Sequence, residues 1–540
     1  MFFIPPFRHR LWMSCLALLM ASHASAADIS KMDLSKMDLP KIEQQHGRFA
    51  LLVDGAPYTV MAAQLHNSSA WPEVLPSTWP SVQALHANTL EAPVYWEQFE
   101  PQPGHFDTTN IDALIDQSRQ HGVRLILLWF GSWKNGQMHY VPSWIKNDPA
   151  HYPRVLDGHG EPVDDLSPYA AANLQADQTA FAALMRHLKQ KDGQQHTVIM
   201  VQVENEPGMI GTVRDHGAAA DALFNAPLSA ALAATLHHPA GTWRTLFGAD
   251  ADEMFNAYGV ARYIDQVAAA GKAEYALPMY VNTWLRYKGK HLPGDDYPSG
   301  GATWNVLDLW KASAPHIDLI GTDLYTTDYT EFTKVVDQYA RPDNPAWISE
   351  TGYDAGNAPY FFYVLAKGGI GFSIFGVDND EDTPARQAAT AAHARNFELV
   401  GDMQRQVAQA AFSGQLLAAV EQRGQPHKTL DLGRWQANVS FGAPLWGDAP
   451  AELAGNPAAD GHVLVIEQSS TEFLLAGFDA RVELARHDDD HRHGQLLRVE
   501  QGRFVNGQWH MQRLWNGDET DYGLNFGKQP TMLKVTVGSY

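Results

Sequence analysis

Residues 197–208 read Thr-Val-Ile-Met-Val-Gln-Val-Glu-Asn-Glu-Pro-Gly. The first part is a short, almost wholly apolar run, which is typical of a buried strand. Glu204, Asn205 and Glu206 follow at once, before a Pro-Gly turn signal. A carboxylate directly after a buried strand costs desolvation free energy unless something uses it. The segment therefore predicts a buried strand whose carboxyl end carries chemistry.

Seven similar apolar segments surround this one, with amphipathic helical stretches such as Ile111–His121, Ala180–Lys191 and Met254–Ala270 between several of them. This alternation predicts an α/β fold, a (β/α)8 TIM barrel with long loops. The alternative is a doubly wound sheet, but residues 64–67, Gln-Leu-His-Asn, are not the Gly-rich phosphate turn that it needs. The predicted strands are Thr59–Leu65, Thr89–Pro93, Arg124–Phe130, Thr197–Val203, Pro278–Asn282, Ile317–Leu324, Ala346–Ser349 and Gly371–Gly376.

Three other regions flank the barrel, which is expected over residues 46–405. Residues 1–26 have the anatomy of a secretory signal peptide, with a small-residue cleavage signature and an apolar run too short to cross a membrane. Residues 27–45 are expected to be a polar, mobile leader or a docking segment. Residues 410–540 predict an all-β, sandwich-like accessory domain, with strands at Thr429–Leu432, His462–Glu467, Glu472–Leu475, Leu496–Val499 and Lys534–Val537.

Composition narrows the possible functions. The formal net charge of −22 disfavours nucleic acid and anionic membranes as partners. Cys15, the one cysteine, lies in the signal segment, so the exported chain offers no thiolate. We interpret the charged run His487–His493 as a solvated turn, and we expect no metal or other cofactor. The 16 Trp residues suit a carbohydrate partner, because flat aromatic faces hold sugar rings.

A second acidic strand end matches the first. The predicted seventh strand ends in Ser349-Glu350, and strands four and seven lie on opposite sides of a barrel mouth, so Glu206 and Glu350 can face each other. Retaining glycoside hydrolysis needs two carboxyl groups ~5–5.5 Å apart, one as nucleophile and one as acid and then base. Alternation alone does not choose between Glu204 and Glu206, because next-but-one residues of a strand share a face.

Asn205-Glu206 and Glu350, at these strand ends, resemble the large clan of (β/α)8 retaining glycosidases. Residues 202–206, Gln-Val-Glu-Asn-Glu, together with the pattern Trp-x-x-x-Glu-Pro-x-Pro-Gly-x-Phe-Asp at residues 96–107, resemble glycoside hydrolase family 35, the β-galactosidases. The resemblance covers roughly residues 45 to 400 and is greatest to the bacterial branch with a C-terminal β-domain. It implies that Glu206 is the acid/base, Glu350 the nucleophile and Asn205 the partner of the sugar 2-hydroxyl.

Further residues at the predicted mouth are candidate substrate contacts. Tyr95 matches the family's substrate-contacting Tyr, and Tyr325 resembles a tyrosine that the clan places near the nucleophile. Trp284 suits a sugar platform beside Asn282, whereas His66 is either a substrate contact or a structural residue. One segment departs from the family pattern: residues 129–136, Trp-Phe-Gly-Ser-Trp-Lys-Asn-Gly, stand where many members have a Cys-Ala-Glu turn, and look more like family 42.

The expected function is that of a retaining exo-β-galactosidase. It would release terminal β-galactosyl residues from oligosaccharides or polysaccharides, such as those derived from xyloglucan. The alternatives are another exo-glycosidase of the clan, a β-mannosidase or β-xylosidase, and a non-catalytic sugar-binding barrel. The sugar-binding barrel is disfavoured because a protein that only binds sugar has no need of two opposed glutamates. We expect an exported protein, periplasmic or extracellular, and homo-oligomerisation stays open.

Overall fold

The computed structural model describes residues 38–379, 382–442, 454–487 and 492–540. The expected signal segment 1–26, the first part of the expected leader and most of the run His487–His493 lie outside the described residues. Within the described residues, no helix has the length and apolar character that crossing a membrane requires.

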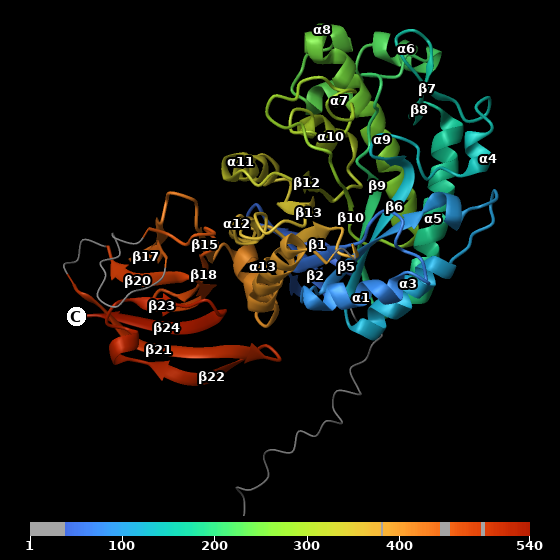
Figure 1. The fold of residues 1–540 in the computed structure, drawn as a ribbon. Coiled ribbons are helices and arrows are strands. Elements are labelled where there is room, and N and C mark those ends of the chain that lie inside the picture. The colour runs from blue at the N-terminus through green and yellow to red at the C-terminus, as the bar shows by residue number, and fades with distance from the viewer. Residues whose placement is uncertain (1–37, 380–381, 443–453, 488–491) are drawn as a thin grey trace, which may run out of the picture. The chain divides into compact units, whose positions relative to one another are not determined.

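A closed parallel sheet forms the centre of the structure (Figure 1). Strands β11 (Leu319–Ile320) and β12 (Thr322–Leu324) are separated only by Gly321; β11 pairs with β10 and β12 with β13, so together they act as one closing strand. The eight strands predicted from the sequence are thereby confirmed, as is the (β/α)8 barrel. The other strands are β4 (Val60–Gln64), β5 (Thr89–Tyr95), β6 (Arg124–Lys134), β9 (Val198–Asn205), β10 (Met279–Val281), β13 (Trp347–Thr351) and β14 (Gly371–Phe375).

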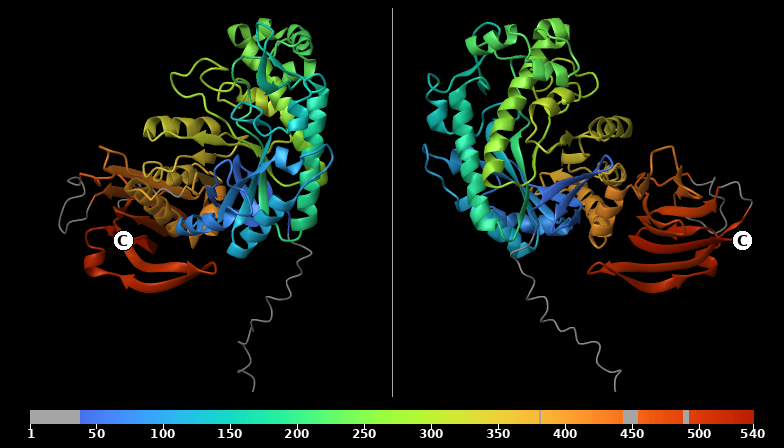
Figure 2. Two further views of the ribbon diagram at one scale, coloured as in Figure 1. Left: turned by 45° about the vertical axis from the view of Figure 1, so that its right-hand side comes forward. Right: turned by 180° about the vertical axis from the view of Figure 1, so that it is seen from behind.

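Helices cover the outside of this sheet, and the strands are buried on both faces as their apolar sequences predict. The long helices α5 (Ala171–Asp192) and α9 (Ala251–Glu274) pack side by side against β6 and β9 (Figure 2). The remaining helices are α1 (Leu75–Ala84), α2 (Trp96–Phe99), α3 (Thr109–His121), α4 (Ser143–Lys146), α6 (Ala218–Asn225), α7 (Ala230–Thr235), α8 (Trp243–Phe247), α10 (Leu307–Ser313), α11 (Tyr329–Tyr339), α12 (Tyr360–Ala366), α13 (Pro384–Gly401) and α14 (Gln404–Ser413). Between α4 and α5, β7 (Arg154–Leu156) and β8 (Pro162–Leu166) form a small hairpin.

A three-stranded antiparallel sheet precedes the barrel. It consists of β1 (Lys41–Gln45), β2 (Arg48–Val53) and β3 (Ala56–Tyr58), so the last five residues of the expected leader are a strand. Arg405 of α14 donates through Nη1 to three carbonyl oxygens, one of β2 and two of β3, at 2.7 to 3.0 Å. This small sheet is thereby tied to the last helix before the β-domain.

The C-terminal β-domain has two antiparallel sheets, of order β15-β18-β19-β24-β21-β22 and β16-β17-β20-β23. Residues of both sheets, such as Val439 and Leu475, share one apolar cluster, as in a sandwich. The five strands predicted there are present. The strands are β15 (Leu416–Val420), β16 (His427–Leu432), β17 (Trp435–Phe441), β18 (His462–Ser469), β19 (Glu472–Phe478), β20 (Ala480–Arg486), β21 (Gly494–Val505), β22 (Gln508–Trp515), β23 (Leu524–Phe526) and β24 (Thr531–Ser539).

The β-domain and the last barrel helices share a core. Leu464, Ile466 and Phe478 of the β-domain belong to the same buried cluster as the barrel residues. Arg395 of α13 also pairs with Asp460 at 2.8 Å and with Asp479 at 3.1 Å. Shared apolar burial contributes more to stability than such half-exposed ion pairs.

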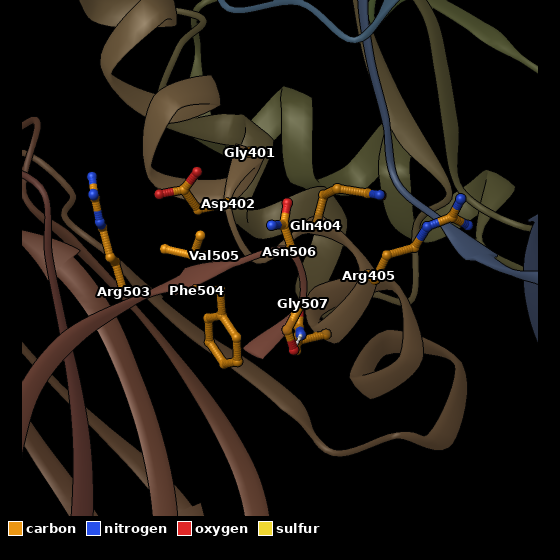
Figure 3. A pocket seen from close by; sticks show the side chains of 10 residues that line it. Gly401, Asp402, Gln404, Arg405, Arg503, Phe504, Val505, Asn506 and Gly507 are labelled. Atoms are coloured by element: carbon orange, nitrogen blue, oxygen red, sulfur yellow. Dashed lines mark hydrogen bonds between the residues drawn. The ribbon is translucent and has the colours of Figure 1, made fainter. Parts of the chain in front are cut away.

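An open cavity of about 460 Å³ lies at this junction (Figure 3). Asp402, Gln404 and Arg405 line one side of it, and residues 503–507 of the β21–β22 hairpin line the other. None of its lining residues is among those expected to contact a substrate. The cavity is therefore a feature of the junction and not of the candidate site.

Candidate active site

Glu206 and Glu350 lie together at the carboxyl ends of the barrel strands. Glu206 directly follows β9, and Glu350 is the fourth residue of β13. Both are close to fully buried, with exposures of 9% and 6%. Burial, and then the negative charge of Glu350, raise the pKa of Glu206 to about 7. The two groups are thus near enough to influence each other's protonation, as an acid and a nucleophile in one site must.

Both oxygens of the Glu350 carboxylate accept a hydrogen bond. Gln64 Nε2, at the end of β4, donates to one oxygen at 2.8 Å, and the Tyr325 hydroxyl donates to the other. One donor ends β4 and the other directly follows β12, and together they fix the orientation of the group, which is what a nucleophile requires. Tyr325 was predicted from the sequence to lie near the nucleophile, but Gln64 was not predicted. Gln64 carries the same signal as the glutamates, a polar residue at the end of an apolar strand.

The backbone of Glu206 has an unusual conformation. Its φ is 44°, in the left-handed region that residues other than glycine rarely adopt. Its N–H donates to Asn282 Oδ1 at 2.7 Å, and its carbonyl oxygen accepts from Gly136 N–H at 3.0 Å. A strained residue persists where its surroundings fix it on several sides, and such residues concentrate at functional sites. The sequence alone could not indicate this strain.

Glu204 faces a different environment. Its carboxyl accepts from Trp133 N–H at 2.7 Å and lies near the carboxyl of Asp177 of α5, which lies on the outside of the sheet. It is fully buried, and desolvation followed by the charge of Asp177 raises its pKa well above the ordinary value. The structure thus places Glu206, and not Glu204, with Glu350.

We expect Glu204→Gln to flatten the pH dependence of stability. An unfolded chain ionises Glu204 near its ordinary pKa of about 4.5, whereas the folded protein keeps it protonated above that pH. The folded state then binds more protons, so the free energy of unfolding falls as pH rises through this range. Glutamine keeps the shape and does not titrate.

Calorimetric unfolding temperatures in mildly acidic and neutral buffers check this prediction. The unfolding temperature of the Glu204→Gln variant should fall less with rising pH than that of the unmodified protein. Glu398→Gln, on the exposed side of α13, is the matched control and should keep the original slope. Identical slopes for the two variants would show that Glu204 is ionised in the folded protein.

Asn205 is fully buried beside Lys134, the last residue of β6. In the amide orientation that satisfies both of its polar atoms, Asn205 accepts from Lys134 Nζ at 3.2 Å. Lys134 is itself buried, and its positive charge lowers the pKa of Glu206 against the larger effects of burial and Glu350. Lys134 lies in the segment that departs from the family 35 pattern, so this departure brings a cation next to the acid/base candidate.

The other predicted contacts divide into exposed and buried residues. Trp284 and Tyr325 are 38% and 42% exposed, so their rings are accessible. Tyr95 is buried, accepts from Ala70 N–H at 3.0 Å and stacks on Trp71 at 5.7 Å.

Asn282 is buried, and both of its amide atoms bond within the protein, to Glu206 and Asp323. Its observed contacts are thus with the candidate acid/base and its neighbour Asp323, and a sugar contact by Asn282 stays a prediction.

Two further motifs have structural partners. Glu100, in the pattern at residues 96–107, accepts from Trp96 Nε1 at 2.9 Å and from Gly104 N–H at 2.8 Å. It therefore holds the turn after β5. His66 pairs with Asp378 at 2.9 Å, and its side chain is 43% exposed. Both a structural role and a contact with substrate therefore stay open for it. Among the described residues, no group of three or more His, Cys, Asp or Glu is arranged to hold a metal ion.

Comparison with known proteins supports the family expected from the sequence. Residues 50–283 match the model of glycosyl hydrolases family 35, and residues 393–527 match a domain of unknown function (DUF5597). The chain is 29% identical over 172 residues to a β-galactosidase of Xanthomonas manihotis, covering 31% of this chain and 26% of that protein. It is 24% identical over 161 residues to a β-galactosidase-1-like protein of Mus musculus, covering 28% and 22%. The matched part thus spans about a quarter of the length of these relatives.

A solved structure, the β-galactosidase from Bacillus circulans sp. alkalophilus, aligns with a TM-score of 0.47 at 12% identity, over 65% of this chain and 57% of that one. The resemblance to glycoside hydrolase family 35 is confirmed by the family model over residues 50–283, which contain the first five strands of the barrel.

Proposed function

We propose, from the match of residues 50–283 to glycosyl hydrolases family 35, that this chain is a retaining exo-β-galactosidase with Glu206 as acid/base and Glu350 as nucleophile. The observation that carries the proposal is the opposed pair itself. One carboxyl has a pKa raised to about 7 by burial and by the charge of the other, and the second is oriented by two donors. Two carboxyl groups with different protonation are what a double displacement requires.

In the first step, the Glu350 carboxylate attacks the anomeric carbon and forms a glycosyl ester. The bond to the leaving oxygen breaks at the same time, and the Glu206 proton passes to that oxygen. In the second step, the Glu206 carboxylate removes a proton from water. The oxygen of that water displaces Glu350, which regenerates both groups and gives a product with retained configuration.

Electrostatics suits Glu206 to both steps. While Glu350 is ionised, its charge keeps the pKa of Glu206 near 7, so Glu206 holds the proton that the leaving group needs. Once Glu350 is esterified its charge is gone, and the pKa of Glu206 must fall. The same side chain is then a carboxylate when a base is needed.

We expect kcat/KM for an unactivated β-galactoside to fall as pH rises through about 7. The free enzyme needs a protonated Glu206, and its pKa of about 7 sets this basic limb. Initial rates at low substrate concentration, from acidic to mildly alkaline buffers, check the prediction. A kcat/KM that stays constant well above this pH would exclude Glu206 as the acid.

The proposed natural substrates are oligosaccharides or polysaccharides with terminal β-galactosyl residues, such as those derived from xyloglucan. The resemblance to family 35 supports the sugar. Exposed aromatic rings after the barrel strands, Trp284 and Tyr325, supply flat faces for a sugar ring. Export, proposed from residues 1–26, would bring the protein to such substrates in the periplasm or outside the cell.

The test is hydrolysis of a panel of p-nitrophenyl β-galactoside, β-glucoside, β-mannoside, β-xyloside and α-L-arabinoside, with NMR of the first-formed anomer. Dominant turnover of the galactoside with release of β-galactose is the expected result. Dominant turnover of the mannoside or xyloside would favour the second candidate, another clan exo-glycosidase, which the departure at Lys134 supports. First-formed α-anomer would contradict retention, and no turnover would favour a sugar-binding barrel.

A further inference from the structure

A third carboxyl group, Asp323 of β12, is buried and lies close enough to both glutamates for their charges to act on it. One oxygen accepts from Asn282 Nδ2 at 2.6 Å, and the other accepts from Ser349 Oγ at 2.9 Å. Asn282 is the residue that binds the Glu206 backbone, and Ser349 precedes Glu350 in the chain. Asp323 therefore contacts the immediate support of each catalytic candidate.

The link to Glu206 depends on the orientation of one amide. Asn282 donates through Nδ2 to Asp323, which leaves Oδ1 to accept from Glu206 N–H at 2.7 Å. That bond helps to hold Glu206 at φ 44°. Without the acceptor at Asp323, only the Glu206 N–H fixes which end of the Asn282 amide faces Glu206. The side chain of Glu206 would then lose part of the support that directs it.

Two routes join Asp323 to Glu350. The first runs through Ser349. In the second, the Asp323 carbonyl oxygen accepts from the Tyr287 hydroxyl at 3.1 Å, that hydroxyl accepts from Tyr325 N–H at 2.9 Å, and the Tyr325 hydroxyl donates to Glu350.

The strand pairing is irregular at the same place. Thr322 pairs with Ile348, but Asp323 pairs with Glu350, so one residue of β13 is passed over. Such bulges redirect side chains next to active sites. The irregularity brings Asp323 opposite the nucleophile candidate.

Asp323 also interacts directly with Glu206. Burial, and then the charges of Glu350 and Glu206, raise the pKa of Asp323 well above its ordinary value, and the interaction between the two carboxyl groups lowers the pKa of Glu206. These directions fit a neutral Asp323 that donates to Glu206. Four tyrosines lie close enough to Asp323 for its charge to affect them, and their ordinary pKa lies above neutrality: Tyr280, Tyr287, Tyr325 and Tyr339.

We infer that Asp323 is a positioning residue that holds Glu206 and Glu350 in a productive arrangement through Asn282 and Ser349. The inference rests on the proposed function and adds a third carboxyl group to it. Because Asp323 is almost fully buried and its oxygens bond to Asn282 and Ser349, it acts through the glutamates and does not itself react.

The experiment compares Asp323→Asn and Asp323→Ala with the unmodified enzyme. Asparagine is neutral and keeps a donor for Glu206, but it cannot accept from both Ser349 and Asn282 while it donates. We expect its kcat/KM on an unactivated β-galactoside to fall by about 10²-fold, the loss typical of a misplaced catalytic group. Its basic pH limit should stay where it is, because no charge is removed.

Alanine removes the donor as well. The pKa of Glu206 should then rise, because its ionised form loses a hydrogen bond, and the basic limit should move to higher pH. The loss of kcat/KM should also be greater for substrates with poor leaving groups than for activated aryl glycosides, because the side chain that loses its position is that of the general acid, Glu206. A basic limit that moves to lower pH in Asp323→Asn would show that a negative charge was removed, and would overturn the neutral assignment.

Asp192→Asn is the matched control. Asp192 is as buried as Asp323 and accepts from Val198 N–H at 2.7 Å, at the opposite end of β9. It should lose thermal stability without a change in the pH limit or in the preference for leaving groups. If Asp323→Asn behaves like this control, or keeps full activity, the positioning role is wrong.

A direct titration separates this inference from the proposed function. The carboxyl carbon of Glu206, followed by NMR in ¹³C-labelled protein and identified by its loss in Glu206→Gln, reports its pKa without any substrate. An unmodified protein that is inactive on the whole glycoside panel would refute the function. A Glu206 pKa that is unchanged in Asp323→Ala, or lowered in Asp323→Asn, would refute the inference even in an active enzyme.

Discussion

Replacing Glu350 with alanine is expected to lower kcat by at least about four orders of magnitude on every substrate, activated or not. The glycosyl ester cannot form without this carboxylate, and a good leaving group does not compensate for a missing nucleophile. Turnover of p-nitrophenyl β-galactoside, with thermal unfolding to confirm the fold, measures the effect. A variant that keeps more than about a tenth of the activity would exclude Glu350 as nucleophile.

Added azide provides an independent readout for this variant. Alanine leaves space on the face of the sugar from which Glu350 attacks, and a small anion can react from there. We expect azide to restore turnover of the activated substrate and to yield the α-glycosyl azide. Glu204→Gln is the matched control, because it alters a buried glutamate on the other side of the sheet and should keep most of the activity.

Replacing Glu206 with alanine should divide substrates by their leaving groups. General acid catalysis contributes about 10²–10⁴-fold, and poor leaving groups should lose all of it. Activated aryl galactosides need little protonation, so their kcat/KM should stay within about tenfold, while kcat and KM fall together because the ester intermediate accumulates. Initial rates on lactose and on p-nitrophenyl β-galactoside measure the division.

Two further outcomes accompany this variant. The basic limb near pH 7 should disappear, because the group that sets it is gone. Azide should now give the β-glycosyl azide, because the space lies on the face where water normally enters. Equal losses on lactose and on the aryl substrate would point to another acid, and Asp323 would be the first to test.

The sequence predicts the barrel well because its signals are local. Each strand is a short apolar run whose neighbours along the chain are turns or amphipathic helices, and burial on both faces of a closed sheet requires that pattern. The same rule locates the glutamates, since an acid after a buried strand is conspicuous. Lys41–Gln45 shows the limit: a polar segment becomes a strand because β2 offers it an edge.

The arrangement around the glutamates could not be predicted in the same way. The choice between Glu204 and Glu206 depends on a backbone that is left-handed at both residues, and at Glu206 it is held by Asn282 and Gly136, which lie far from it in the chain. Asn282 is at a strand end, as predicted, but only the fold shows that it supports Glu206. Asp323 also lies near the end of a predicted strand. Its hydrogen bonds with Asn282 and Ser349 form only when the fold brings three separate strands together, so the sequence does not predict them.

The shared core of the barrel and the β-domain has a consequence for recombination. Phe362 of α12 lies against the ring of His462 at 3.9 Å between centroids, and His462 also bonds Asn396 of α13. A gene cut between α14 and β15 would leave apolar surface exposed on both products. Exchange of the β-domain between homologues should therefore succeed only when the breakpoint lies before α12, so that these helices are inherited with the strands they cover.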